Sequence, residues 1–164
     1  MHRARAAIGS LVFLVAAPGV VAGVLPWALT GWETGSPTPV LQVVGVILGA
    51  GGVIVLLNAF ARFVVEGVGT PAPIAPTEQL VVGGLYRHVR NPMYLAVAAT
   101  IIGQALILGR PGLLVYAAVF CVVVAAFVHA YEEPTLAARY GQQYEAYRLA
   151  VPAWRPRLRP WNRP

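Results

Sequence analysis

Four long apolar stretches constrain this chain more than any other feature. They run roughly over Ala6–Leu29, Val40–Ala61, Pro92–Leu108 and Leu113–Tyr131. About 20 apolar residues in an α-helix cross the ~30 Å hydrocarbon core of a bilayer. Hydrophobic residues make up 58% of the sequence and charged residues only 11%, too few to cover the surface of a soluble domain of this size. We therefore expect an all-α integral membrane protein, a single membrane domain with about four transmembrane helices.

The first stretch resembles a signal peptide, because Arg3 and Arg5 precede it. It is longer than the roughly 7–15-residue apolar core of a signal peptide, so we expect it to remain as a span. Pro18 and Pro26 predict a kink, which transmembrane helices tolerate.

The arginines predict the orientation. All twelve basic residues are arginine, and all but Arg110 fall in the N-terminal segment, the long middle connection or the C-terminal tail. Basic residues favour the cytoplasmic side of a membrane. We expect a bacterial cytoplasmic membrane with both termini in the cytosol. We expect the basic surface to contact anionic lipids, not nucleic acid, because the arginines lie at the ends of apolar runs.

Glycines line one face of the second stretch. Gly45, Gly49 and Gly52 would let a neighbouring helix approach closely. The neighbour can be another helix of this chain or a second copy, so a homo-oligomer is possible.

Two polar segments are predicted on the cytosolic side, Glu78–Tyr94 and His129–Arg148. In the first, Gly83-Gly84 permits close approach of a ligand, and Asn91 is a candidate N-cap for the third span. The second contains Glu132-Glu133, which are costly at a membrane edge unless they are solvated or paired. A solvated helix end is the simpler interpretation; a cation site is the alternative.

The tail predicts an amphipathic helix from Glu132 to about Leu149. Tyr140, Tyr144 and Tyr147 are spaced to share one helix face. Beyond it, Trp154 and Trp161 among several arginines are typical of a membrane interface.

Several chemistries lack their motifs. The sequence has no dinucleotide-binding glycine motif, no phosphate-binding loop, no zinc-type histidine pair and no serine–histidine triad. The single cysteine, Cys121, has no partner for an internal disulfide. We therefore expect no metal site.

Two blocks of sequence resemble the isoprenylcysteine carboxyl methyltransferase family, which is related to the membrane phospholipid methyltransferases. The first is Gly84-Leu85-Tyr86-Arg87-x-x-Arg90-Asn91-Pro92-Met93-Tyr94. The second begins Tyr131-Glu132-Glu133-Pro134 and continues through Tyr140-Gly141-x-x-Tyr144-x-x-Tyr147 to Val151-Pro152. The resemblance covers roughly residues 66–157. It implies a methyltransferase core at 64–164, with residues 1–63 as a scaffold hairpin.

The resemblance implies methyl transfer from S-adenosylmethionine (AdoMet) to a lipophilic acceptor that enters from the bilayer. The residues implied to contact the cofactor are Glu78, Gln79, Leu80, Val81, Tyr86, Asn91, Pro92, Met93, Tyr94 and Glu132. Glu133, Arg90 and His129 are the candidate catalytic residues. An ionised carboxylate acceptor needs no general base, whereas an amine acceptor would make Glu133 or His129 a candidate base.

The chain departs from the family at two positions. Many members carry histidine where this chain has Asn91, and the arginine that handles substrate in the eukaryotic enzymes aligns with Val128. The acceptor can therefore differ from a prenylated cysteine carboxylate. Two alternatives remain: an NADPH-dependent membrane reductase of the sterol-reductase type, and a non-enzymatic small transporter or scaffold.

Overall fold

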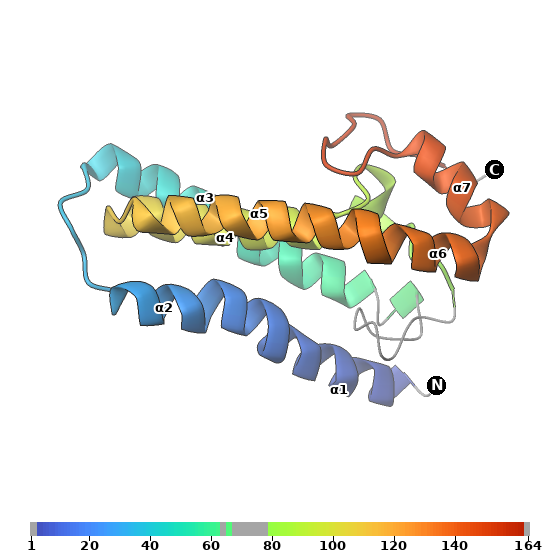
Figure 1. Cartoon of the computed structure of the whole chain (residues 1–164), viewed down its shortest axis with the longest axis horizontal. Coiled ribbons are helices and arrows are strands. Elements are labelled where there is room, and N and C mark those ends of the chain that lie inside the picture. Colours follow the sequence, from blue (N-terminus) through green and yellow to red (C-terminus); the bar gives the residue numbers. More distant parts are fainter. Residues whose placement is uncertain (1–2, 63–64, 67–78, 163–164) are drawn as a thin grey trace. The chain divides into compact units, whose positions relative to one another are not determined.

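The computed structural model describes residues 3–62, 65–66 and 79–162, and this part of the chain is helical with irregular connections and no strand. Figure 1 follows the elements along the chain. The helices are α1 (Arg3–Leu14), α2 (Leu25–Thr30), α3 (Pro39–Arg62), α4 (Pro92–Leu108), α5 (Gly112–Phe127), α6 (Glu133–Tyr140) and α7 (Gln142–Ala150). Segments η1 (Val15–Val24) and η4 (Val128–Glu132) are π-helical, as are the described residues 65–66, and η3 (Gly84–Arg87) is a 3₁₀ helix.

Three helical runs are long and apolar enough to cross a membrane. They are Ile8–Thr30, Pro39–Arg62 and Gly112–Tyr140. They correspond to the first, second and fourth predicted spans. The third predicted span is α4, whose 17 residues give about 25 Å of helix at 1.5 Å per residue, slightly less than the usual hydrocarbon thickness.

The predicted tail helix is divided at Gly141. Its first half, η4 and α6, continues directly from α5 as one run to Tyr140. Gly141 has φ +51°, a left-handed conformation that glycine adopts readily, and α7 begins at the next residue. Tyr144 and Tyr147 therefore share α7, where both are buried, while Tyr140 ends the preceding helix.

The chain forms two compact units. The first unit comprises residues 1–13, 58–92 and 125–164, and the second comprises 14–57 and 93–124. Each contains parts of both the predicted scaffold hairpin and the predicted core, so that functional division stays a prediction.

In the second unit, side chains from two helices satisfy carbonyl groups that a proline leaves open. Pro26 has no N–H, so it cannot donate to the carbonyls four and five residues before it, those of Ala22 and Val21. The Gln104 amide donates to Ala22 O at 2.6 Å, and the Tyr116 hydroxyl donates to Val21 O at 2.8 Å. Unsatisfied backbone groups are expensive in lipid. The polar Gln104 of α4 thus has a structural role.

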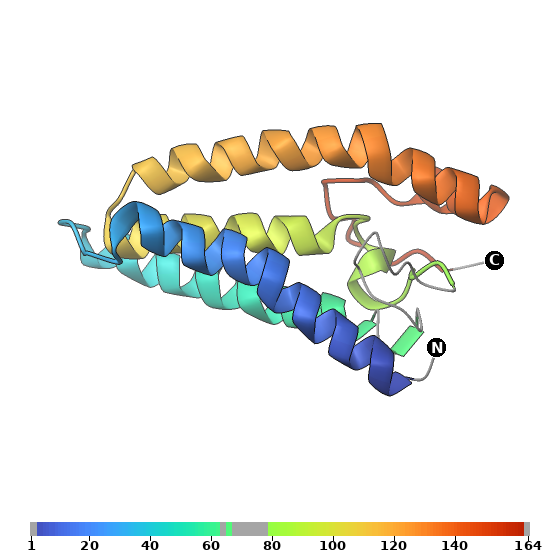
Figure 2. The same cartoon turned by 60° about the horizontal axis from the view of Figure 1, so that its bottom comes forward.

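Glycines bring α3 and α4 together within the second unit, and Figure 2 shows the two helices side by side. A Cβ atom on Gly45 would lie 2.7 Å from Gly103 O, and one on Gly52 would lie 2.7 Å from Ala96 O. The predicted glycine face therefore packs against α4 of the same chain.

The two short connections of the second unit lie at the same end of its helices. Gly35 N donates to Leu108 O at 2.7 Å, and Arg110 Nε donates to Glu33 O at 3.0 Å. The start of α3 and the end of α4 are therefore neighbours, so α4 runs antiparallel to α3.

Candidate functional site

The loop before α4 is fastened to the end of α3. The Glu66 carboxylate accepts a hydrogen bond from Gly83 N at 2.9 Å. It also forms an ion pair with Arg62 Nη1 at 2.8 Å. A side chain on either glycine of Gly83-Gly84 would collide with this pair: a Cβ on Gly84 would lie 2.7 Å from Arg62 Nε. Gly84 also has φ +56°. The groups that approach this glycine pair closely in the structure are the side chains of Arg62 and Glu66, whereas the predicted approach of a ligand stays a prediction.

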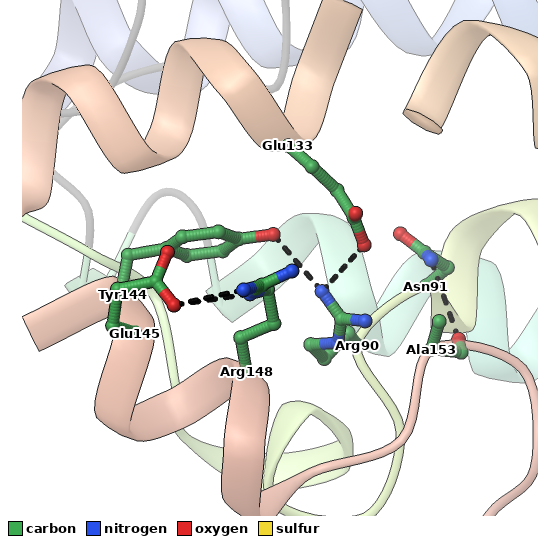
Figure 3. A network of polar contacts seen from close by, with 7 residues as sticks. All are labelled: Arg90, Asn91, Glu133, Tyr144, Glu145, Arg148 and Ala153. Atoms are coloured by element: carbon green, nitrogen blue, oxygen red, sulfur yellow. Dashed lines mark hydrogen bonds and ion pairs between the residues drawn. The ribbon is translucent and has the colours of Figure 1, made fainter. Parts of the chain in front are cut away.

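Arg90 joins the two polar segments. Its Nη1 donates to Glu133 Oε1 at 2.7 Å and to the hydroxyl of Tyr144 at 2.9 Å, and Figure 3 shows all three side chains converging. The Arg90 and Glu133 side chains are only 12% and 18% exposed. An ion pair so withdrawn from water is costly to break from one side, by about 3–5 kcal/mol. Arg90 Nε is buried with no hydrogen-bond partner among the described residues.

The π-helical turn before α6 places Glu133 beside Arg90. It is the first residue of α6, directly after the π-helical η4, and its N–H bonds to Val128 O, five residues back. Pro134 follows it, and a proline cannot supply the N–H that the regular helical ladder needs. Single π-helical turns of this kind often occur at functional sites.

The C-terminal strap, defined here as residues 151–162, folds back along the loop before α4. Arg90 N donates to Pro152 O at 3.0 Å, Arg157 N to His88 O at 2.9 Å, and Trp161 N to Arg87 O at 2.9 Å. Side chains reinforce the pairing. His88 Nδ1 donates to Arg157 O at 2.8 Å, Arg87 Nε donates to Trp161 O at 2.8 Å, and Arg87 also bonds the Asn162 side chain.

Asn91 is fixed by the same strap. Its Nδ2 donates to Ala153 O at 3.3 Å, and the residue is 7% exposed. Asn91 directly precedes α4, in the position predicted for an N-cap. In the structure, the amide nitrogen is used by the strap.

Two buried tyrosines of α7 contact this region. Tyr147 OH donates to Tyr86 O at 2.7 Å, and its ring lies 5.5 Å from that of Trp161. Burial raises the pKa of Tyr147 well above its ordinary value. Burial also raises the pKa of Tyr144, although the charge of Arg90 opposes this effect. Both hydroxyls are therefore neutral groups at pH 7.

The other predicted site residues have distinct environments. Val81, Tyr86 and Pro92 are buried, Leu80 and Glu132 are half-buried, and Gln79 is exposed. His129 is exposed on η4. Met93 and Tyr94 continue α4 and belong to the second unit. Glu78 lies outside the described residues.

Sequence reasoning did not anticipate the contribution of the strap or of Glu66. The bonds between the strap and the loop before α4 are mostly to main-chain atoms, and they join residues 62 or more positions apart, so they leave no motif. Tyr144 is part of the second sequence block that resembles the family, but its hydrogen bond with Arg90 is visible only in the structure.

The family comparison covers most of these elements. The model of the family described as "Phospholipid methyltransferase" matches residues 40–143, more than half of the chain. The chain belongs to the phospholipid methyltransferase family. No curated protein matches it, and no solved structure does.

Phospholipid methyltransferase family membership makes the chain a membrane methyltransferase, in agreement with its apolar helices. It supports neither the reductase nor the transporter alternative. The match begins in α3 and ends just inside α7, so it includes Arg90, Asn91 and Glu133 but not the strap. Among the described residues, no group of three histidine, cysteine or acidic side chains could hold a metal ion.

Proposed function

We propose that this chain is an AdoMet-dependent methyltransferase that acts on a lipophilic, membrane-borne acceptor. The observation that supports it most is the contact of Arg90 with Glu133 at 2.7 Å. It joins one residue from each of the two resembling blocks, 43 positions apart in the sequence, in a chain of a methyltransferase family.

The residues present fit such a cofactor. When bound, AdoMet supplies an electrophilic methyl group on a cationic sulfur. The carboxylate of Glu133 and the neighbouring Glu132 provide negative charge for a cation, and Tyr86 offers an aromatic ring in the same segment as Asn91. Because methyl transfer is an in-line displacement, holding donor and acceptor in line supplies much of the rate enhancement.

Carboxyl methylation, as in the isoprenylcysteine carboxyl methyltransferases, is the acceptor chemistry that we favour. Glu133 is already paired with Arg90 and shielded from water, which suits a carboxylate that orients other groups better than one that removes a proton. An acceptor carboxylate is ionised at pH 7 and needs no base. An amine, as in phospholipid methylation, is the second candidate, because the family bears that description.

Four membrane crossings and cytosolic termini complete the proposal. Because the end of α4 lies beside the start of α3, a chain whose α3 crosses the bilayer returns through α4. Local thinning of the bilayer accommodates a short helix at modest cost. The polar loop, α6 and α7 would then lie on the cytosolic side, where we place the amphipathic tail.

The test is methyl transfer by the full chain in lipid nanodiscs. Protein is incubated with AdoMet labelled in its methyl group and with a prenylated cysteine derivative or phosphatidylethanolamine. We expect label in the prenylated carboxylate, released as methanol by mild base. Glu133→Gln should lower the rate at least tenfold, while Glu145→Gln, on the exposed side of α7, should retain it. Label in the amine lipid alone would replace the first acceptor by the second. NADPH binding without AdoMet binding would refute the proposal.

A further inference from the structure

The C-terminal strap has an inward side and an outward side. Val151 is 0% exposed, and the N–H groups of Arg157 and Trp161 donate to the loop before α4 at 2.9 Å each. Figure 1 shows the strap, drawn in red, beside this green loop. The exposed residues of this stretch form the outward side, and they are Trp154, Arg155, Pro156, Leu158, Arg159 and Pro160. The strap therefore presents basic and apolar side chains away from the loop that it binds.

Leu158 projects from anchored main chain. It is 97% exposed, and it lies between Arg157 and Trp161, whose N–H groups are both bonded to the loop. Single exposed leucines are common on protein surfaces, but a leucine set among arginines and a tryptophan is typical of segments that lie in a membrane interface. Of the two tryptophans predicted at such an interface, Trp154 lies on the outward side, whereas the ring of Trp161 packs against Tyr147 at 5.5 Å.

The positive charge of the outward side has no acidic partner in the part of the chain that the structure describes. Arg155 and Arg159 are exposed, and residues 151–162 include no acid. Three acids of the same unit are already in ion pairs, Glu66 with Arg62, Glu133 with Arg90 and Glu145 with Arg148. A basic surface with an apolar tip is complementary to anionic lipid headgroups above hydrocarbon.

The strap is anchored next to the start of an apolar helix. Arg90 N donates to Pro152 O at 3.0 Å, and Arg90 stands two positions before Pro92, the first residue of α4. Two residues span at most about 7 Å, so the strap begins close to the membrane surface where α4 crosses the bilayer as proposed. The bilayer is therefore a permanent neighbour of the strap, which a soluble acidic protein or a nucleic acid is not.

We propose that the outward side of the strap binds the anionic surface of the bilayer, and that this contact holds the strap against the loop before α4. Arg155 and Arg159 lie at lipid phosphates, and Leu158 lies at the level of the headgroups. Lipid that binds only the docked strap stabilises the docked state by mass action. The same strap fixes Asn91 and the main chain of Arg90, so lipid composition controls the order of the candidate site. Neither AdoMet nor the methyl acceptor enters this inference, which therefore goes beyond the proposed function.

Hydrogen exchange tests the effect of lipid on the strap. Full-length protein is placed in nanodiscs of phosphatidylcholine, with or without phosphatidylglycerol, and deuterium uptake of the strap and of the loop before α4 is followed by mass spectrometry. We expect the amides of Arg90, Arg157 and Trp161 to exchange about fivefold more slowly, or slower still, in the anionic nanodiscs, because anionic lipid attracts basic side chains and opposes local opening. High salt should remove most of the difference, since it screens this attraction.

A probe at position 158 tests the contact itself. In a Cys121→Ser background, Leu158→Cys is labelled with bimane, whose fluorescence is quenched by nearby lipids that carry a nitroxide on the headgroup. At equal nitroxide content, we expect stronger quenching in the anionic nanodiscs than in the neutral ones.

Two double variants separate the strap from overall charge. Arg155→Gln/Arg159→Gln should exchange at the same rate in both lipid mixtures. Arg139→Gln/Arg148→Gln removes the same charge from exposed positions of α6 and α7. It should keep the wild-type difference between lipids, because Arg148 is already paired with Glu145.

The outcomes are distinguishable from those of the methyl-transfer assay. Equal exchange of the wild type in both lipid mixtures, or equal loss of the difference in both double variants, would overturn the inference. Quenching at position 158 that does not depend on anionic lipid would overturn it as well. The comparison of lipids on the wild type needs no variant, so it decides the question even where a double variant does not fold. Absence of methyl transfer would refute the proposed function and leave this inference standing.

Discussion

The buried hydroxyl of Tyr147 makes the stability of the folded protein sensitive to alkaline pH. The side chain is 3% exposed and its hydroxyl bonds Tyr86 O. Burial raises its pKa in the folded chain, so above pH 10 the unfolded chain loses this proton first. The contribution of Tyr147 to stability is therefore complete below pH 10 and decreases as the pH rises further, by up to about 1.4 kcal/mol per pH unit.

We predict that Tyr147→Phe flattens this alkaline decrease. At pH 8 the variant should be less stable by about 1 kcal/mol because one hydrogen bond is lost. Between pH 10 and 11.5 its thermal midpoint in detergent should decrease less than that of the wild type. Tyr131→Phe changes a ring that is 49% exposed and should keep the wild-type slope. Parallel curves for the wild type and Tyr147→Phe would contradict the prediction.

Helix packing in the second unit depends on the absence of side chains. A Cβ on Gly103 would lie 2.7 Å from Gly45 O and from Gly49 N, both main-chain atoms that cannot move aside. Gly51 lies on the same α3, but a Cβ there would meet nothing within 4 Å. The two positions form a matched pair.

We predict that Gly103→Ala destabilises the protein by about 1–3 kcal/mol through overpacking. Gly51→Ala should be neutral or slightly stabilising, since alanine favours helix over glycine by up to about 1 kcal/mol. Thermal unfolding followed by circular dichroism in one detergent measures both. Equal midpoints for the two variants would show that α3 and α4 do not approach as closely as described.

The elements that sequence predicts well are those determined by local composition. Local sequence places α4 at Pro92–Leu108, because the apolar run is bounded by Asn91-Pro92, which begins the helix, and by Gly109, which ends it. Glycine spacing likewise identifies the packing face of α3, though not which helix covers it. The break at Gly141 was missed because glycine inside a helical pattern is often tolerated.

The candidate site is less accessible to sequence reasoning. The resemblance brought out Arg90, Asn91 and Glu133, and the structure places Arg90 against Glu133. The partners of Asn91 and His88 are carbonyl oxygens of Ala153 and Arg157. Every residue offers a main-chain carbonyl oxygen, so no sequence pattern can specify this pairing.

Across the whole molecule, the predicted arrangement of membrane crossings rests on two observations. The arginine distribution predicts which side is cytosolic. The hydrogen bond from Gly35 N to Leu108 O places the connection before α3 and the connection after α4 at the same end of the helices of the second unit. From them we predict that Ser36 and Gly112 lie on the side of the membrane opposite to Leu158.

Cysteine labelling tests this arrangement. In a Cys121→Ser background, single substitutions Ser36→Cys, Gly112→Cys and Leu158→Cys introduce thiols at exposed positions. In intact bacteria, a membrane-impermeant maleimide should label the first two, because positions 36 and 112 are predicted outside. It should label position 158 only after the membrane is permeabilised, since the 97% exposed Leu158 is predicted in the cytosol. Labelling of Ser36→Cys but not Gly112→Cys would mean that α4 does not cross. Labelling of position 158 in intact cells, with positions 36 and 112 protected, would place the candidate site outside the cell. It would then be separated from the supply of AdoMet that the proposed function needs.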